Sequence, residues 1–346
     1  MGPTNLSIKR CKSIYTGDGI PGETVGRMDA ACKPPGTGSR CVSEGIASPK
    51  SVNTFRGIGS AYSHHGELLQ GVFRDQQGKL CHGLVTMPIQ QRGAEVSFSY
   101  DRFLSQLAVF PKHKTKALTA AQLTLDYFGL SHSGQLYIDT YVAEGAGLGS
   151  STADVVATCY AIANAFNLPI SEQQVAKIAV MAECASDPLM FRKGVMFYAQ
   201  REGRVIEVLG DRLPSFGLIS FSLGEPVATC CYSPKYSGSD IDDFSYLLSL
   251  LRQAVDSADV RLLGKVGMLS AKINQRFLPK PYFDDILDIV EINQLPGLQI
   301  AHSGNRVGLL FSAEDSDKAE RIIDTKNRLL RLGIRHVDIV NDVLNA

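Results

Sequence analysis

The sequence lacks a charge imbalance, a long apolar run and any Cys-x-x-Cys module. Its 35 Lys and Arg balance 35 Asp and Glu, so a basic surface for nucleic acid or an anionic membrane is not expected. No window of about 18 uncharged apolar residues occurs, which argues against a membrane-spanning helix. The eight cysteines are scattered apart from the adjacent pair Cys230 and Cys231, and this spacing disfavours a zinc ribbon.

Scattered thiols in a chain of this size are typical of a reducing compartment, where they serve as small apolar residues. The first residues contain no apolar segment of the kind found in a leader peptide. We therefore expect a cytoplasmic protein with no nucleic acid and no membrane among its partners. A homodimer is compatible with the sequence.

The composition and the hydrophobic periodicity divide the chain into three parts. Residues 1–50 are rich in Gly, Pro, Ser and Thr without a sustained period, which predicts a disordered extension. Strand-like and helix-like segments then alternate irregularly, which indicates two α+β domains over residues 51–212 and 213–346. The helices that we expect cover residues 118–128, 153–166, 172–185, 242–258, 261–277, 283–293 and 316–332. The strands that we expect cover residues 58–62, 84–88, 94–100, 135–142, 196–200, 204–209, 217–223, 298–301, 307–311 and 336–340.

A glycine-rich turn between a predicted strand and a predicted helix carries the strongest functional signal. Gly145, Gly147 and Gly149 let backbone N–H groups turn toward one point with no Cβ in the way. The helix that follows adds unpaired amides and the positive end of its dipole. Hydroxyls at residues 150–152 can donate to phosphate oxygens or complete a magnesium shell. The predicted phosphate cradle consists of Gly145, Ala146, Gly147, Leu148, Gly149, Ser150, Ser151 and Thr152.

Two better-known glycine motifs do not fit this turn. It is not Gly-x-x-x-x-Gly-Lys-Ser/Thr, so a Walker-type ATPase is disfavoured. It is not Gly-x-Gly-x-x-Gly either, because Ser150 stands in place of the third glycine. No repeated βαβ pattern supports a dinucleotide-binding dehydrogenase. A turn that serves packing alone is the plain alternative to an anion site.

The residues of this turn resemble a known family. Gly-Leu-Gly-Ser-Ser at residues 147–151 is similar to the core motif of the GHMP kinases, which include galactokinase and the homoserine, mevalonate and phosphomevalonate kinases. Ala143 stands where that family usually has proline. The continuation Ser-Thr-Ala-Asp at residues 151–154 resembles the L-threonine kinase branch linked to cobalamin biosynthesis. Gly-Glu-Leu-Leu-Gln-Gly at residues 66–71 and Ser-Gly-Asn-Arg-Val-Gly-Leu-Leu at residues 303–310 resemble the other two motifs of the same branch.

The resemblance implies an α+β fold of two domains: an N-terminal domain like ribosomal S5 domain 2 and a C-terminal ferredoxin-like α/β domain. It also implies that the outer two motifs border the acceptor. We expect Glu67 and His65, with Ser303 and Gly304, to shape the acceptor pocket. A turn-capping surface carboxylate is the alternative for Glu67. Since adjacent residues on a strand point to opposite faces, at most one of the neighbours His64 and His65 can enter a site.

The best acidic cluster is the segment from Glu183 to Asp187, where a predicted helix ends. The family resemblance implies that Asp187 is the catalytic base and that Glu183 and Ser151 hold Mg²⁺. Ala185 replaces the usual proline of this segment, and Glu183 lies one position earlier than the branch's usual glutamate. The alternative for Asp187 is a turn-forming aspartate before proline.

Together these observations predict a kinase that uses ATP and Mg²⁺ to phosphorylate a hydroxyl group of a small metabolite. Such a reaction requires an aligned hydroxyl, a metal and donors placed where charge develops. The resemblance points to L-threonine as the acceptor, with homoserine or another amino-alcohol as the near alternative. A nucleotide-binding sensor or partner subunit without turnover is the alternative from another functional class.

Overall fold

The structure is a computed structural model, and it describes residues 55–224, 235–301 and 304–341. These residues belong to one compact unit, which spans residues 53–346. The extension predicted for residues 1–50 lies outside the described residues, and the domain boundary predicted near residue 212 stays a prediction. The strands are β1 (Arg56–Arg74), β2 (Leu80–Ser99), β3 (Leu107–Phe110), β4 (Gly134–Thr140), β5 (Met196–Ala199), β6 (Arg204–Val208), β7 (Phe216–Ser222), β8 (Gly297–Ile300), β9 (Arg306–Ser312) and β10 (Val337–Val340). The helices are α1 (Thr115–Tyr127), α2 (Ser150–Ala165), α3 (Glu172–Glu183), α4 (Gly238–Asp256), α5 (Val260–Asn274), α6 (Phe283–Ile292) and α7 (Lys318–Arg331).

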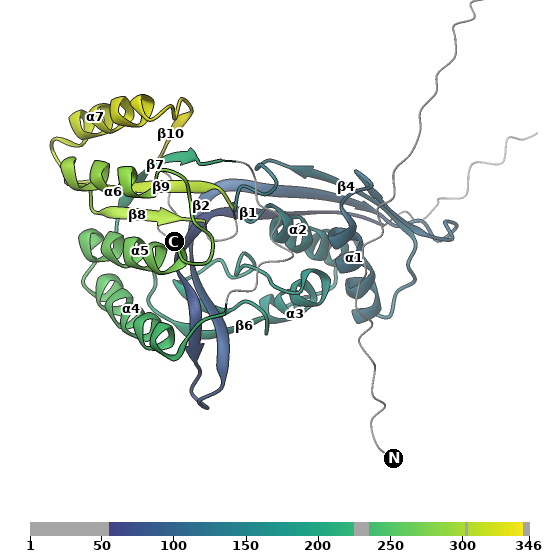
Figure 1. Cartoon of the computed structure of the whole chain (residues 1–346). Coiled ribbons are helices and arrows are strands. Elements are labelled where there is room, and N and C mark those ends of the chain that lie inside the picture. Colours follow the sequence, from purple (N-terminus) through teal and green to yellow (C-terminus); the bar gives the residue numbers. More distant parts are fainter. Residues whose placement is uncertain (1–54, 225–234, 302–303, 342–346) are drawn as a thin grey trace, which may run out of the picture. The chain divides into compact units, whose positions relative to one another are not determined.

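Two long strands, β1 and β2, run through the middle of a single sheet (Figure 1). The strand order is β10-β7-β9-β8-β1-β2-β4-β3, and β5 joins β2 to β6 off this path. Every pair is antiparallel except β3 with β4. β1 meets β8 at one pair of residues, Glu67 and Ile300. The β7–β8–β9 part of the sheet therefore joins the rest at Glu67, beside the predicted acceptor motif.

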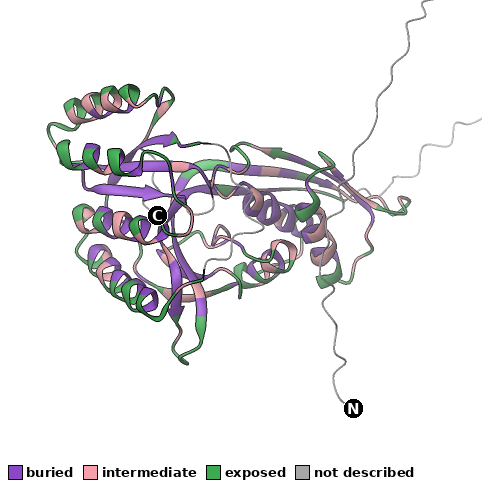
Figure 2. Ribbon diagram, viewed as in Figure 1, coloured by how far each residue is buried: buried purple, intermediate pink, exposed green. Residues whose placement is uncertain are grey.

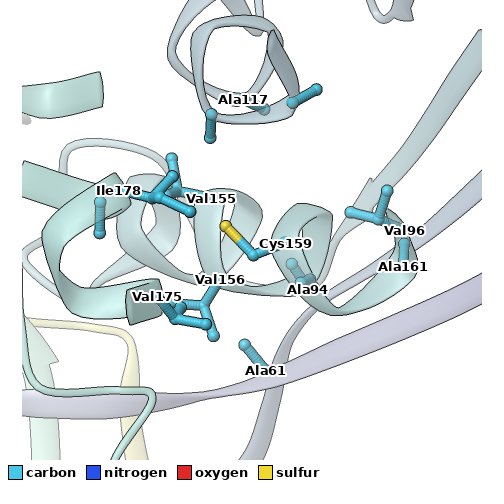
Figure 3. Packing of buried hydrophobic residues seen from close by; sticks show 14 of the residues in the cluster. Ala61, Ala94, Val96, Ala117, Val155, Val156, Cys159, Ala161, Val175 and Ile178 are labelled. Atoms are coloured by element: carbon cyan, nitrogen blue, oxygen red, sulfur yellow. The ribbon is translucent and has the colours of Figure 1, made fainter. Parts of the chain in front are cut away.

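The first hydrophobic core forms around α2, which is buried along most of its length. Figure 3 shows its side chains between α1, represented by Ala117, and the strands, represented by Ala61 and Ala94. Gly57 and Gly59 of β1 face α2 so closely that a Cβ on either would overlap the α2 backbone. This close approach fixes the middle and the C-terminal end of α2 against β1.

Two further cores lie on opposite faces of the β7–β8–β9 region. Leu218 and Leu310 pack with α4 and α5, whereas their neighbours Ile219 and Leu309 pack with α6 and α7. Alternate residues of a strand point to opposite faces, so one strand serves both layers. The helices are buried toward the sheet and exposed outward, as Figure 2 shows. None of the helices in the described part of the chain combines the length and apolar character that a membrane span requires.

The predicted elements agree with the structure in kind, and most ends move by a few residues, but β1 continues to Arg74 where the prediction ended at residue 62. The helix predicted for residues 172–185 begins after the N-cap Ser171, which forms a capping box with Gln174. β2 is one strand where the sequence suggested two, because the polar stretch at residues 89–93 continues the strand across irregular pairings with β1. β3 was not predicted, since its four residues are too few to show a period.

His65 generates a prediction about stability and pH. Its Nδ1 lies 2.8 Å from Gln299 Oε1 and its Nε2 lies 2.6 Å from Ser220 Oγ, so the buried ring ties β1 to β8 and β7. Burial lowers the pKa of His65 to about 4, although the hydrogen bond to Gln299 opposes this. Unfolding restores a pKa of about 6.5, so the unfolded state binds more protons between these values and stability falls as pH falls through this window.

We expect this group to remove about 2 kcal/mol from the free energy of unfolding between pH 7.5 and pH 5. Urea unfolding of the wild type and of His65→Asn at both pH values measures the difference. The variant should be less stable at pH 7.5 and should lose this part of the pH dependence. The control variant His132→Asn should keep the same pH dependence of the free energy of unfolding as the wild type. An unchanged pH dependence in His65→Asn would contradict the prediction.

Candidate active site

The glycine-rich turn adopts a backbone that suits an anion. Gly145, Gly147 and Gly149 have φ values of 73°, 82° and 72°, a region that side chains with a Cβ rarely adopt. Gly149 is the N-cap of α2, no side chain caps the first turn, and that turn carries no acidic residue. The amides at the start of α2 are therefore not occupied by a capping side chain.

The same turn is pressed against the chain before and within β9. A Cβ on Gly147 would lie 2.4 Å from Ala301 Cβ, and one on Gly304 would lie 2.3 Å from the backbone of Ala146. The amide of Arg306 donates to the carbonyl of Ala146 at 3.1 Å. Gly304, one of the predicted acceptor residues, thus lies against the predicted phosphate cradle, and Ser303 lies outside the described residues.

Glu183 lies directly beneath the start of α2. Its Oε2 accepts a hydrogen bond from Ser151 Oγ at 2.8 Å, and its Oε1 accepts one from Thr152 Oγ1 at 2.8 Å. Only 2% of its side chain is exposed, and the ammonium of Lys116 lies 3.8 Å from Oε2. Burial raises the pKa of Glu183 to about 7, and the charge of Lys116 opposes this only in part. The structure therefore brings the two predicted metal-binding residues, Ser151 and Glu183, together around a carboxylate that lacks a full counter-charge.

Asp187 lies beside Glu183, and its side chain is 21% exposed. Its Oδ2 lies 3.1 Å from His64 Nε2 and 3.4 Å from Thr152 Oγ1. Among the described residues, Oδ1 has no hydrogen-bond partner. One hydroxyl group, that of Thr152, thus contacts both carboxylates, and one oxygen of Asp187 is left for another partner.

The surroundings of His64 favour its imidazolium form. Its Nε2 faces Asp187, and its Nδ1 lies 3.2 Å from the carbonyl of Gly66, so both ring nitrogens face acceptors and both are placed to donate. Burial disfavours the charged ring, but the Asp187 carboxylate outweighs this and raises the pKa of His64. Burial would likewise raise the pKa of Asp187, and the charge and hydrogen bond of His64 instead hold that pKa below its ordinary value.

The remaining predicted acceptor residues are divided between two environments. Glu67 is 3% exposed and offers a carboxylate oxygen within 4.8 Å of ligand atoms of His64 and Asp187. His65 points to the other side of β1, where it is buried against Gln299 and Ser220. The structure therefore brings Glu67, but not His65, to Asp187. The trio of Glu67, His64 and Asp187 is a poor metal site while both nitrogens of His64 donate hydrogen bonds.

A buried lysine fastens the elements on both sides of the turn. Lys114 Nζ donates to Thr140 Oγ1 at 2.7 Å, to Asp154 Oδ2 at 2.7 Å and to Glu144 Oε1 at 2.5 Å. Thr140 ends β4, Glu144 precedes the first glycine, and Asp154 lies in α2. Thr140 also donates to Asp154 Oδ1 at 2.7 Å. All three N–H donors of the ammonium are used, so Lys114 holds the turn at both ends.

Sequence reasoning missed four cations near the site. His64 was weighed against His65, but register shifts in β1 between residues 61 and 69 make simple alternation unreliable there. Lys114 and Lys116 stand in the basic segment 112–116, which was a detectable signal. Lys280, whose Nζ donates to the carbonyl of Gly304, gave no sequence signal at all.

Comparison with known proteins shows what the chain is similar to. A protein-family profile described as the GHMP kinases N terminal domain matches residues 115–191. That span begins with α1, contains the glycine-rich turn and both hydroxyl donors to Glu183, and ends just past Asp187. Over these residues the chain is similar to the GHMP kinases.

Two curated relatives of the chain are named L-threonine kinase. The one from Citrobacter freundii is 29% identical over 192 residues, which are 54% of this chain and 66% of the relative. The one from Salmonella typhimurium is 29% identical over 177 residues, which are 50% of this chain and 58% of the relative. The chain thus aligns with less than two thirds of the length of either relative.

Solved structures support the fold. Homoserine kinase from Cytophaga hutchinsonii matches with a TM-score of 0.60 at 16% identity, covering 86% of this chain and 97% of that chain. L. major mevalonate kinase in complex with R-mevalonate matches with a TM-score of 0.58 at 15% identity, covering 83% and 96%. At these identities the likeness shows the two-domain GHMP fold alone.

The cluster around Lys114 generates a second prediction. Lys114→Met leaves the carboxylate of Asp154, whose side chain is 6% exposed, without its cation, and we expect a loss of about 3 kcal/mol in the free energy of unfolding. Urea unfolding measures it. The double variant Lys114→Met/Asp154→Leu should recover part of the loss, because no uncompensated buried charge remains.

Arg204→Met is the matched control, because it removes a cation from Asp75 while Arg204 itself is 45% exposed. Its cost should stay below about 1 kcal/mol. Equal costs for the two cation-to-methionine changes would show that Lys114 is no more than a surface ion pair.

Proposed function

We propose that this protein is a small-molecule kinase that transfers the γ-phosphoryl group of ATP to a hydroxyl group, with L-threonine as the acceptor. The observation that carries the proposal is the position of Glu183 and Asp187, which share the hydroxyl of Thr152 at the uncapped start of α2. An anion-binding helix end beside two carboxylates, one of them free at Oδ1, matches the needs of phosphoryl transfer. The kinase names of the curated relatives support the same reaction class.

The phosphate groups of ATP would bind at residues 145–152. The left-handed glycines and the free amides of the first turn of α2 offer donors without charge, and Ser150 contributes a hydroxyl at the helix end. Close packing of Gly147 on Ala301 restricts the turn to this shape, so the donors are arranged before the nucleotide binds.

The site also fits Mg²⁺. Ser151 and Glu183 form a set of oxygen donors, which is what this cation prefers, and the buried Glu183 carboxylate lacks a full counter-charge. Bound there, Mg²⁺ would supply charge stabilisation for the phosphate oxygens. A cation at this point would also favour the ionised form of Glu183, whose pKa of about 7 otherwise leaves it partly protonated.

Asp187 would orient the acceptor hydroxyl through Oδ1 and receive its proton. The acceptor oxygen forms a bond to phosphorus as the bond from phosphorus to the bridging oxygen of ADP breaks. His64 would keep Asp187 ionised and fix its rotamer through Oδ2. Glu67 and Gly304, with Ser303, would border the acceptor, whereas the role proposed for His65 would be indirect, through the fixed strand β1.

The acceptor itself rests on the family resemblance and on the names of the relatives. Homoserine or another amino-alcohol is the second candidate, and the likeness to a homoserine kinase structure fits it. A nucleotide-binding protein without turnover is the alternative of another class. It would bind MgATP tightly and release no ADP with any hydroxy-amino acid.

Release of ADP from MgATP with a panel of hydroxy-amino acids tests the proposal. We expect ADP with L-threonine, and we expect Asp187→Asn to lower kcat by a factor of about 10² to 10⁴. Asp139→Asn, an exposed aspartate on β4, is the matched control and should retain full activity. Nucleotide binding without ADP release across the panel would instead support the sensor.

The pair of His64 and Asp187 predicts a shift in the pH profile. His64→Gln removes the cation that lowers the pKa of Asp187, so the acidic limb of kcat/KM should move to higher pH. The loss of activity should therefore be largest on the acidic limb and smallest at alkaline pH, where Asp187 is ionised in both proteins. The exposed His336→Gln is the control; an unmoved limb in His64→Gln would contradict the pairing.

A further inference from the structure

Two lysines close together at the start of α1 have different surroundings. Lys114 is buried, and each of its three N–H donors has an acceptor. Lys116, in the first turn of α1, is 45% exposed. Among the described residues no acceptor lies within hydrogen-bond distance of its ammonium, and the nearest carboxylate oxygen is Glu183 Oε2 at 3.8 Å.

The ammonium of Lys116 faces the carboxylate of Glu183. The side chain of Glu183 is 2% exposed and already accepts hydrogen bonds from Ser151 and Thr152. Lys116 approaches the same carboxylate from a solvent-accessible position. Its ammonium therefore lies on the solvent side of the Glu183 carboxylate, and its charge lowers the pKa of both Glu183 and Asp187.

The cations near the turn differ in the donors they retain. His64 uses both nitrogens on Asp187 and Gly66, and Lys114 uses all three donors. Lys280 is buried and donates to the carbonyl of Gly304. Of these four described cations, Lys116 alone retains every donor. Transfer of a phosphoryl group develops charge on its oxygens that needs such a donor.

We propose that Lys116 is a catalytic residue whose ammonium contacts the γ-phosphoryl group during its transfer. The inference rests on the proposed kinase function and adds a residue that the family motifs do not include. The ammonium exchanges no proton: it donates hydrogen bonds to the phosphoryl oxygens, while the acceptor proton goes to Asp187 and the bridging oxygen leaves with ADP. Lys114, by contrast, is a positioning residue.

Nucleotide binding and turnover together test the proposal. Lys116→Met should lower kcat for the acceptor about 100-fold, the usual loss for one transition-state donor. It should also weaken binding of a non-hydrolysable ATP analogue about tenfold while binding of ADP stays unchanged, because ADP has no γ-phosphoryl group. Lys116→Arg should recover most of the affinity for the analogue. Isothermal titration calorimetry of the full chain with Mg²⁺ gives both affinities.

Lys112→Met is the matched control, because Lys112 is an exposed lysine of the same basic segment without a described partner. It should leave kcat and both affinities unchanged. Equal weakening of ADP and of the analogue by Lys116→Met would overturn the proposal, since a lysine that only balances Glu183 would act on both nucleotides. An unchanged kcat would overturn it as well.

The same titrations separate this inference from the function on which it rests. A wild type that binds neither nucleotide refutes the proposed kinase function. A wild type that binds both and turns over, with Lys116→Met indistinguishable from it, refutes only the role of Lys116. Thermal unfolding of each variant confirms that the fold is intact; because Lys116 is exposed and forms no hydrogen bond among the described residues, Tm should stay within about 2 °C of the wild type.

Discussion

Close contact between two backbone segments is the constraint on which the site depends. Gly147 touches Ala301, and Gly304 touches Ala146, with no room for a Cβ at either glycine. A single hydrogen bond from Arg306 to Ala146 closes this contact. Ala301 follows β8 and Arg306 begins β9, so these contacts hold the glycine-rich turn against the ends of two strands. Its amides are held open at the helix end, which is the condition for binding an anion without a cost in reorganisation.

The charges around this turn are arranged in pairs of a buried group and a more exposed group. Lys114 is neutralised inside by Asp154 and outside by Glu144. Asp187 is paired with His64, and this leaves Glu183 as the buried carboxylate without a full partner. Two hydroxyl groups and a distant ammonium stabilise Glu183 incompletely. Such a site is stabilised most when a cation and a phosphate group bind together. The cation compensates the carboxylate of Glu183, and the phosphate compensates the positive charges and the amides around the turn.

Much of the architecture and part of the site were predictable, for identifiable reasons. The capping box at Ser171 and the strand–turn–helix at residues 145–152 are local patterns, and both appear in the structure. Glu183 and Ser151 also meet as predicted, because both lie at helix ends next to the turn. The short strand β3 and the continuity of β2 were missed, since four residues show no period and a polar stretch hides a strand.

The sequence by itself determined the glycine-rich turn, the elements around it and, through three motifs, the resemblance to the GHMP kinases. These are properties of neighbouring residues, and local backbone chemistry is enough to encode them. Only the tertiary structure decided that His64 rather than His65 faces Asp187, because irregular pairing of β1 sets which side chain turns inward. The tertiary structure likewise decided that the N–H donors of Lys114 are all hydrogen-bonded within the protein and that those of Lys116 are not. Asp154 and Glu144 lie 40 and 30 residues from Lys114 along the chain, and only folding brings such distant charges together.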